Sequence, residues 1–439
     1  MMKRARVYLA ALGIAAVALI AAASAGGSGT STNQAAKRSA VSGTVSIISE
    51  ATGAEQKNFL KVIDDFKKLY PKVNVKYSSA GRQLPTILST AVAGGNPPDI
   101  ALVPQPALVR ELVKKKALKP ITFVRPTVKR DWSSGWLQLG TIKGKLYGLY
   151  LKGANKSTVW YDTATFKSAG VKPPKTFPGL IKIAKTIKAS GAKAYSIGGG
   201  EGWTLTDLFE NVYIRQAGPA LYDKLAAHKI KWTHSSVKAA LRTMAQIFSD
   251  TGNIAGGASG ALETSFADSV TNAFGKPSKA AMVLEGDFVE GTAPTSAKAG
   301  KDFNFFDFPS IKGSPKSVVT GGDAVVMFRD KPANRALVRY FASARAGTVW
   351  AKLGGFSSPN KRVKGSAYSD PVARRAALIL AHAKIARFDM SDQAPTSFGG
   401  TAGQGEWKLL QDFLKDPKDV NGTATKLEEA AAKAYKSGG

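Results

Sequence analysis

One tryptophan stands between a glycine-rich segment and an apolar helical pattern, in the stretch GGGEGWTLTDLFE at 198–210. A flat indole with polar groups beside it suits a ligand whose ring has an apolar face and polar edges, since binding sites combine apolar walls with a few hydrogen-bonding groups. Trp203 and Asp207 are therefore predicted to contact a ligand. Thr204 and Asp207 have the spacing of a capping box, which predicts that the helix begins just after Trp203. The alternative, a core tryptophan that plugs a helix end, stays open on this stretch alone.

Other polar side chains follow apolar, strand-like runs. Gln105 comes shortly after the run at 99–103, and LEGDF at 284–288 puts two acids and an aromatic residue directly after another run. Asp323 ends a small glycine loop that precedes a third strand-like run. Open parallel sheets bind ligands at the carboxyl ends of their strands, so Gln105 is predicted to be a ligand contact rather than only a surface amide.

No specific catalytic or metal-binding motif accompanies these residues. The chain has no cysteine and three widely separated histidines, His228, His234 and His382. It contains no HExxH helix, Walker loop or GxSxG elbow, so no metal, cofactor or catalytic residue is predicted. Two carboxylates across a cleft would suit glycoside hydrolysis, with Glu201, Asp207, Glu285 and Asp287 as candidates. The favoured interpretation is that such acids accept hydrogen bonds from ligand hydroxyl groups.

The elements that must position these side chains alternate between strand and helix patterns. Residues 44–49, 73–77 and 99–103 read as strands, and 55–69 and 84–93 read as helices, which predicts βαβ units and a largely parallel sheet. A second series has helices at 177–190, 206–217, 237–249, 334–353, 371–385 and 423–435, and strands at 194–197, 281–284 and 304–308. A strand at 147–151 begins this series, and 318–328 is predicted to rejoin the first part. Two α/β lobes with a cleft between them follow from this order.

The charge balance and the first residues bear on location and partners. The 439 residues include 62 Lys and Arg against 31 Asp and Glu, a formal net charge of +31. The lysines are scattered rather than clustered, so nucleic acid is not predicted as a partner, and attraction to an anionic envelope fits better.

Residues 1–25 have a basic start, an apolar run and an Ala-x-Ala-like end, which predicts a signal peptide, with a retained anchor as the alternative. Residues 26–43 read as a flexible linker.

Four stretches together resemble the extracellular solute-binding proteins of ABC sugar importers, the family that includes maltose-binding protein. They lie at 81–106, 145–162, 202–225 and 321–361, and the motifs NPPD at 96–99 and GGFSSPNK at 354–361 are the most specific. The likeness covers about residues 44–435.

The resemblance implies a type II-like periplasmic-binding-protein fold, in which each lobe is a mostly parallel sheet flanked by helices and the ligand cleft lies at the hinge. It assigns 44–151 and 312–357 to lobe 1, and 152–311 and 358–439 to lobe 2. By position in the family it also implies a set of ligand-binding residues. These are Arg82, Gln83, Gln105, Lys152, Trp203, Asp207, Glu285, Gly286, Asp287, Phe288, Asp323, Phe356 and Phe398.

The resemblance further implies a monomeric, non-enzymatic receptor that is exported to the periplasm or cell surface. Its expected partners are a mono- or oligosaccharide and the membrane permease, to which hinge closure presents the sugar. Two departures stand out: Ala25-Gly26-Gly27 lacks the lipid-modified cysteine common at this point, and the charge is unusually positive. Two alternatives therefore remain, a basic secreted protein that binds anionic sugars or envelope polymers, and a secreted glycan-acting enzyme.

Overall fold

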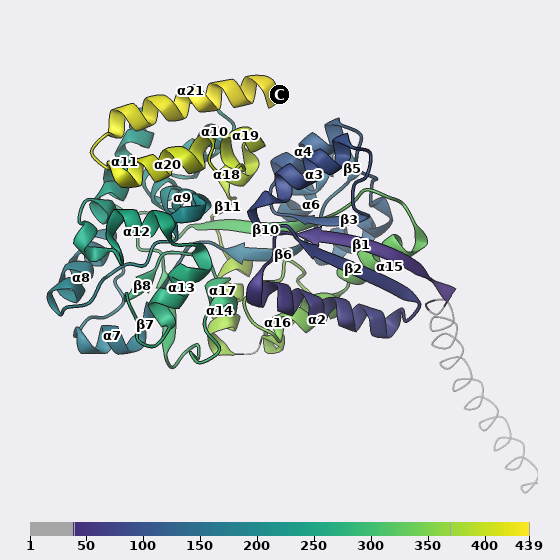
Figure 1. Ribbon diagram of the computed structural model, residues 1–439, viewed down its shortest axis with the longest axis horizontal. Helices are drawn as coiled ribbons and strands as arrows, with labels where there is room; N and C mark the ends of the chain where they lie inside the picture. The colour runs from purple at the N-terminus through teal and green to yellow at the C-terminus, as the bar shows by residue number, and fades with distance from the viewer. Residues whose placement is uncertain (1–37, 39, 369, 439) are drawn as a thin grey trace, which may run out of the picture.

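The computed structural model describes residues 38, 40–368 and 370–438. The predicted signal peptide lies outside the described residues, as does most of the predicted linker. The chain forms two lobes, with the N-terminal strands in one and the C-terminal helices in the other (Figure 1). Within the described residues, no helix is long and apolar enough to span a membrane.

The first lobe is built from the predicted strand–helix alternation. It runs β1 (Gly43–Ser49), α2 (Gly53–Leu69), β2 (Val73–Ser79), α3 (Leu84–Ala93), β3 (Ile100–Val103) and α4 (Pro106–Lys114). Strand β1 pairs in parallel with both β2 and β3. Helix α2 buries Phe59, Val62, Ile63 and Phe66, whose spacing of three and four residues forms one apolar face. This confirms the βαβ prediction for the first lobe.

Two longer strands connect the lobes. Strand β10 (Val318–Met327) pairs antiparallel with β3 near its end and with β6 (Leu149–Asn155) along its length. The short strand β11 (Ala386–Phe388) pairs in parallel with its beginning. The register between β10 and β6 shifts at Asp323 and Ala324, where a β-bulge turns the strands locally. Both strands run between the lobes in Figure 1.

The second lobe contains a three-stranded sheet in which β7 (Thr158–Asp162) lies between β8 (Met282–Val283) and β9 (Phe303–Asp307). Both pairings are antiparallel, so the expectation of mostly parallel strands in each lobe is wrong for this lobe. The three strands come from distant parts of the chain, and no βαβ crossover fixes their direction. Around the sheet lie α7 (Thr163–Ser168), α8 (Phe177–Ala189), α9 (Trp203–Ala217), α10 (Pro219–Ala226), α11 (Ser235–Phe248), α12 (Gly257–Glu263), α13 (Phe266–Phe274) and α14 (Val289–Thr292).

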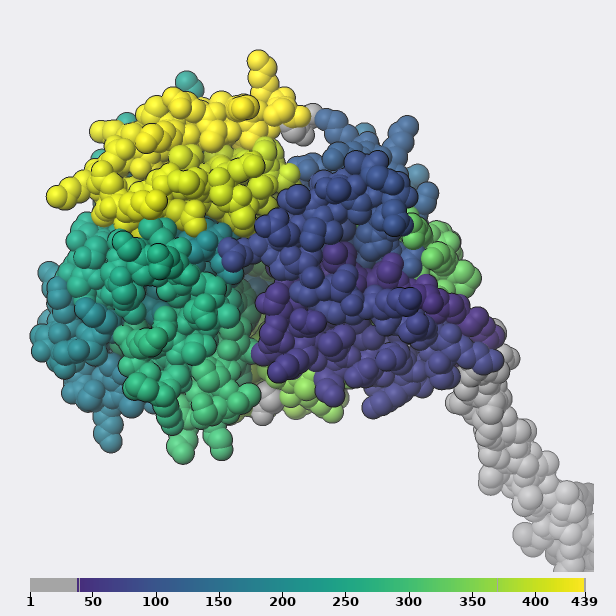
Figure 2. Space-filling view, viewed as in Figure 1, coloured from purple at the N-terminus to yellow at the C-terminus, as the bar shows by residue number. Residues whose placement is uncertain are grey.

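The remaining elements complete the lobes. They are α5 (Arg125–Asp131), α6 (Ser134–Leu139), β4 (Thr141–Ile142), β5 (Lys145–Leu146), α15 (Pro332–Phe341), α16 (Ala344–Ala351), α17 (Pro371–Ala381), α18 (Met390–Gln393), α19 (Thr396–Gly399), α20 (Gly405–Lys415) and α21 (Val420–Gly438). Short 3₁₀ turns occur at 81–83, 122–124, 199–201, 251–253 and 365–367. Figure 2 shows the C-terminal segment, in yellow, covering one end of the second lobe.

Helix α17 contacts the cores of both lobes. Ala373 and Ala377 pack with the first-lobe core, whereas Val372 and Ala376 pack with Trp160 and Phe303 of the second. The helix therefore links the two lobes through two neighbouring faces of its surface.

Two glycines bring the backbones of the lobes together. Gly291 lies in α14, and Gly355 follows α16 with a positive φ of 61°. A Cβ atom added to Gly355 would lie 2.5 Å from the Cα atom of Gly291, closer than real Cβ contacts allow. This approach therefore requires that neither residue have a side chain.

Some elements differ from the sequence prediction. The helix predicted at 334–353 is two helices, because Ser343 caps the start of α16 by accepting a hydrogen bond from the Ala346 N–H group. The segment predicted as a strand at 194–197 makes only isolated bridges through Tyr195. The predicted capping box is also wrong: α9 begins at Trp203, and the Thr204 hydroxyl donates instead to the Gly198 carbonyl.

Candidate ligand-binding site between the lobes

A cavity of about 610 Å³ opens where the two lobes meet. Glu50 and Gln105 line it from the first lobe, one and two residues beyond the ends of β1 and β3. Lys152 and Asp323 line it from β6 and β10 at the floor. Trp203, with other aromatic residues, lines it from the second lobe. Its volume is in the range of sites that hold small molecules, and both lobes and the strands between them contribute to its wall.

Seven of the predicted site residues line this cavity, namely Arg82, Gln83, Gln105, Lys152, Trp203, Phe288 and Asp323. They come from segments up to 241 positions apart in the sequence, so the fold gathers them. Their contact with a ligand remains a prediction, but their shared position makes it a coherent one.

Six predicted residues do not line the cavity: Asp207, Glu285, Gly286, Asp287, Phe356 and Phe398. Phe356 stacks on Trp350 in the first-lobe core, with ring centroids 4.9 Å apart, and Phe398 packs edge-on against Trp232 in the second-lobe core. Both rings therefore stabilise the lobes in this structure. The buried Asp287 carboxylate accepts a hydrogen bond of 2.5 Å from the Ser357 hydroxyl.

Glu285 and Gly286 do not line the cavity, but their backbone carbonyl groups fix the position of the segment that carries Phe288. The Glu285 carbonyl accepts a hydrogen bond from the Thr158 hydroxyl, and the Gly286 carbonyl accepts one from the Trp160 indole. A side chain at position 286 would collide with the Phe288 ring, so this glycine allows Phe288 to fold back toward the cavity.

An aromatic wall closes the second-lobe side of the cavity. The ring centroids of Trp203 and Phe266 are 5.3 Å apart, those of Phe266 and Phe288 are 5.3 Å apart, and those of Trp203 and Phe288 are 5.9 Å apart. Gly202, with φ of 85°, lets α9 begin against Trp407, which also lines the cavity. The Trp203 indole donates a 3.0 Å hydrogen bond to Glu201, which fixes the orientation of its ring.

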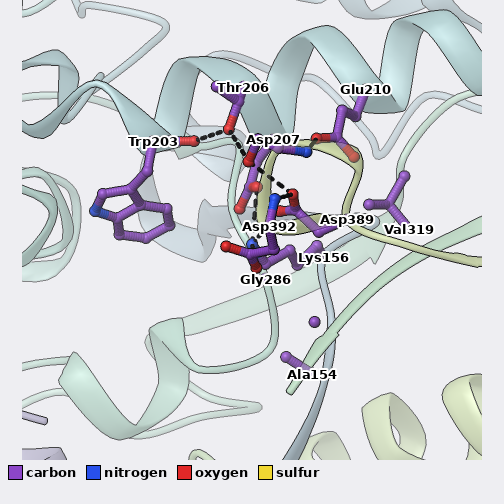
Figure 3. Close-up of polar contacts among 12 residues, drawn as sticks. Ala154, Lys156, Trp203, Thr206, Asp207, Glu210, Gly286, Val319, Asp389 and Asp392 are labelled. Atoms are coloured by element: carbon purple, nitrogen blue, oxygen red, sulfur yellow. Dashed lines mark hydrogen bonds and ion pairs between the residues drawn. The ribbon is translucent and has the colours of Figure 1, made fainter. Parts of the chain in front are cut away.

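Behind this wall, the Lys156 ammonium group lies among three carboxylates (Figure 3). Its Nζ atom is 3.0 Å from Asp207, 2.5 Å from Asp389 and 3.8 Å from Asp392. Burial alone would lower the pKa of Lys156, but the three acids outweigh it and raise that pKa well above its usual value. Burial raises the pKa of Asp207 to about 8, whereas Lys156 holds the pKa of Asp389 below its usual value despite burial. Asp207 therefore does not line the cavity itself, but it contacts Lys156, which does.

A second buried ammonium group lies at the floor. Lys152 donates to Glu55 of α2 and is 3.8 Å from Asp323 of β10. Although burial opposes the charge, these two carboxylates raise the pKa of Lys152. Burial also raises the pKa of Asp323 to about 6, against the attraction of Lys152. The side chains of Lys152, Glu55 and Asp323 are therefore held in position by one another before a ligand contacts them.

The two lobes also touch across the mouth of the cavity. Arg82, which follows β2, forms an ion pair of 3.1 Å with Glu201, which precedes α9. Arg82 also donates to the Gly200 carbonyl. Figure 2 shows the lobes meeting along a seam on this face of the molecule. The side chain of Arg82 is 43% exposed, so the pair is accessible to solvent and to salt.

Several lining residues were not predicted from the sequence: Glu50, Glu55, Lys156, Glu201, Phe266, Ser391, Asp392 and Trp407. For Glu201 the sequence suggests only a possible catalytic acid. Glu50 could have been predicted, because it directly follows the strand at 43–49. Gln105 was predicted by the same rule, that ligand-binding residues follow the carboxyl ends of strands. Ser391, Asp392 and Trp407 lie far along the chain from the other lining residues, and only the tertiary structure brings them to the cavity.

Comparisons with known proteins agree with this architecture. The family model described as bacterial extracellular solute-binding protein matches residues 50–348. The osmoprotective compounds-binding protein GgtB of Synechocystis sp. is 31% identical over 339 residues, covering 75% of this chain and 79% of the relative. The alpha-glucosides-binding periplasmic protein AglE of Rhizobium meliloti is 31% identical over 365 residues, covering 79% of each chain.

Solved structures share the fold at low sequence identity. The bacterial solute receptor AcbH, whose structure is described as showing an exclusive preference for β-D-galactopyranose, superposes with a TM-score of 0.81. It is 16% identical, and the match covers 90% of this chain and all of AcbH. A chitin oligosaccharide binding protein matches with a TM-score of 0.74 and 18% identity over 90% of this chain and 99% of its own. At these identities the likeness concerns the fold.

Proposed function

This chain belongs to the bacterial extracellular solute-binding protein family, and from that membership we propose that it binds a carbohydrate between its two lobes. The receptor delivers the sugar to the permease of an ABC importer, and it works outside the cytoplasmic membrane without changing its ligand chemically. The observation that carries the proposal is the 610 Å³ cavity lined from both lobes, with an aromatic wall on one side and polar groups on the other.

The lining suits the two kinds of surface that a sugar ring presents. Trp203 covers the apolar face of the ring in this proposal, while Gln105, Lys152 and Asp323 exchange hydrogen bonds with its hydroxyl groups. Removing hydroxyl groups from water is costly unless directed partners replace the lost hydrogen bonds. The preorganised pairs around Lys152 supply such partners without large rearrangement.

Closure of the lobes follows from the two-sided lining. A ligand shifts an equilibrium between open and closed states only by its difference in affinity for the two. A sugar that contacts both lobes binds the closed state more tightly, so it favours closure, and the closed form is what the permease recognises.

A thermal-shift screen tests the proposal directly. We expect a neutral mono- or oligosaccharide, at 100 times its dissociation constant, to stabilise the purified protein by about 2.7 kcal/mol. The screen should include sugar acids and sugar phosphates, and it should be run at two salt concentrations. Stabilisation by neutral sugars that salt does not change supports the cleft receptor. Stabilisation by acidic compounds alone, fading with salt, would instead support binding of anionic envelope polymers.

The Arg82–Glu201 pair allows a separate test of closure. Replacing Arg82 by alanine is expected to weaken affinity for the sugar found in the screen by up to about fivefold, because an exposed ion pair contributes at most about 1 kcal/mol. The chain has no cysteine, so Ile87→Cys and Ser259→Cys, exposed on α3 and α12, can carry a dye pair. Energy transfer between the dyes should rise with sugar and should need more sugar in the Arg82 variant.

A matched control is Arg335→Ala, which breaks an exposed ion pair with Asp330 inside the first lobe. It should leave both the affinity and the dye signal as in the unsubstituted protein. Sugar binding without any change in energy transfer would argue against closure while leaving binding itself in place.

A further inference from the structure

The cavity does not share the strong positive charge of the whole chain. Five carboxyl groups face the cavity, from Glu50, Glu55, Glu201, Asp323 and Asp392, and three cationic groups, from Arg82, Lys152 and Lys156. When all are ionised the lining carries a formal charge of −2, although the chain carries +31. The basic character of the protein therefore does not extend into its ligand site.

The cationic groups of the lining are already engaged. Arg82 pairs with Glu201, and Lys152 pairs with Glu55 and Asp323. Lys156 is surrounded by three acids, two of which lie behind the lining. An anionic ligand would have to displace these buried carboxylates from their lysines, which leaves charges unpaired in a site of low dielectric.

Glu50 is the carboxyl group that remains available. Among the described residues, none donates a hydrogen bond to its side chain or forms an ion pair with it. Asp323 of β10, Glu55 of α2, Lys152 of β6 and Lys156 beyond β6 are charged groups that act on it, and Glu50 in turn acts on the Asp392 carboxyl group of α18. Burial, and then the charges of Asp323 and Glu55, raise the pKa of Glu50 to about 8, because the two neighbouring lysines do not compensate fully.

A second acceptor without a partner lies in the same lining. Gln105 is only 4% exposed, and its side-chain oxygen has no hydrogen-bond partner among the described residues. A buried amide oxygen without a donor is costly, so this position favours a ligand that brings N–H or O–H groups.

The aromatic wall is compatible with positive charge. The Lys152 ammonium group lies 5.8 Å from the centroid of Phe288, and that of Lys156 lies 5.8 Å from the centroid of Trp203. Aromatic faces attract cations through their quadrupole, as they also accept the apolar face of a sugar. The wall therefore adds no barrier to a cationic ligand.

From these contacts we propose that the ligand is a sugar bearing a protonated amino group, with its ammonium group held by the Glu50 carboxylate and the Gln105 side-chain oxygen. The inference rests on the proposed function and specifies its ligand class. On binding, the proton of the Glu50 carboxyl group passes to solvent, and the ammonium group keeps its own. Sugars that carry a carboxylate or a phosphate are disfavoured, because the three cationic groups of the lining are already paired with carboxylates.

The test uses matched sugars that differ in one group. Glucose, galactose and mannose are each compared with the 2-amino sugar, the N-acetylated 2-amino sugar and, where it exists, the uronate. Titration calorimetry at pH 6.5 in two buffers of different ionisation enthalpy reports affinity and proton release together. We expect one amino sugar to bind about tenfold more tightly than its neutral counterparts, to release up to one proton, and to weaken with salt. Uronates should bind at least tenfold more weakly than the neutral sugars.

Variants assign the effect to Glu50. Glu50→Gln should remove the proton release and lower affinity for the amino sugar about tenfold. Glu263→Gln, at an exposed position of α12 outside the cavity, should change neither quantity. Thermal unfolding of both variants verifies that they fold, and the buffer comparison on the unsubstituted protein does not depend on any variant.

The outcomes separate this inference from the proposed function. Tight binding of a neutral sugar, with no gain from the amino group and no released proton, overturns the inference and leaves the carbohydrate receptor intact. Preference for a uronate overturns it as well. Absence of binding by every sugar in the set and in the wider screen contradicts the proposed function, and the inference falls with it.

Discussion

Replacing Trp203 by alanine is expected to weaken sugar binding about 30-fold, or about 2 kcal/mol, the loss typical of a central aromatic anchor. Trp203 lines the cavity, packs against Phe266 and Phe288, and is held in orientation by Glu201. Its removal opens the wall to water and removes the flat apolar surface for the sugar ring. Titration calorimetry with the sugar identified by thermal shift measures the effect.

Trp203→Leu is the matched comparison, because leucine keeps apolar volume but offers no flat ring. We expect it to recover only a small part of the lost affinity. If leucine restores binding fully, general apolar burial rather than ring stacking explains the wall. If alanine itself leaves the affinity unchanged, Trp203 is a structural residue, the alternative that its sequence context allowed.

Replacing Lys156 by methionine is expected to destabilise the protein by about 3–5 kcal/mol, because it leaves buried carboxylates without their cation. The substitution keeps most of the side-chain volume, so the loss reports charge rather than packing. Chemical denaturation at pH 7 measures it. Lys188→Met is the matched control, since Lys188 pairs with Asp250 at 2.7 Å but both side chains are nearly half exposed. We expect the control to cost at most about 1 kcal/mol.

The destabilisation of the Lys156 variant should depend on pH in a definite direction. Without the cation, the pKa of Asp389 rises in the folded state from below to above its unfolded value, and the pKa values of Asp207 and Asp392, which burial already raises, rise further. Carboxyl groups of this kind favour folding at low pH, and that advantage is lost as the pH rises through the folded-state pKa. The deficit relative to the unsubstituted protein should therefore be larger at pH 8 than at pH 5. An equal deficit at both would contradict the charge explanation.

Local patterns in the sequence were sufficient for the first lobe. The helix predicted at 84–93 has those bounds, and the strand predicted at 73–77 is only two residues longer, ending at 79. Both predictions succeeded because periodic apolar residues define the elements and turn residues define their ends. The second-lobe sheet was less predictable. The strands predicted at 281–284 and 304–308 correspond to β8 and β9, but the central strand β7 was not among the predicted elements. The break within 334–353 depends on one capping serine inside a continuous apolar period.

The candidate site was predictable where it follows strand ends. Gln105 was found by that rule, and applying it to the strand before Glu50 would have found the acid on which the ligand inference depends. Lys156 could not be distinguished from the other cationic residues, because its burial among three acids is a property of the tertiary structure. The family resemblance placed Phe356 and Phe398 near the ligand, whereas here both pack in lobe cores.

A substitution at the contact between Gly291 and Gly355 could change the ligand concentration that half-saturates the receptor without changing which ligand it binds. One methyl group at either position would force apart the two backbones that touch here, and we expect it to disfavour the arrangement of the lobes seen in this structure. Apparent affinity scales with the population of the binding-competent state, so the concentration of nutrient that half-saturates the receptor would rise. The cavity and its contacts would stay the same. Adaptation to a richer habitat is therefore accessible through a single substitution at a position outside the cavity lining.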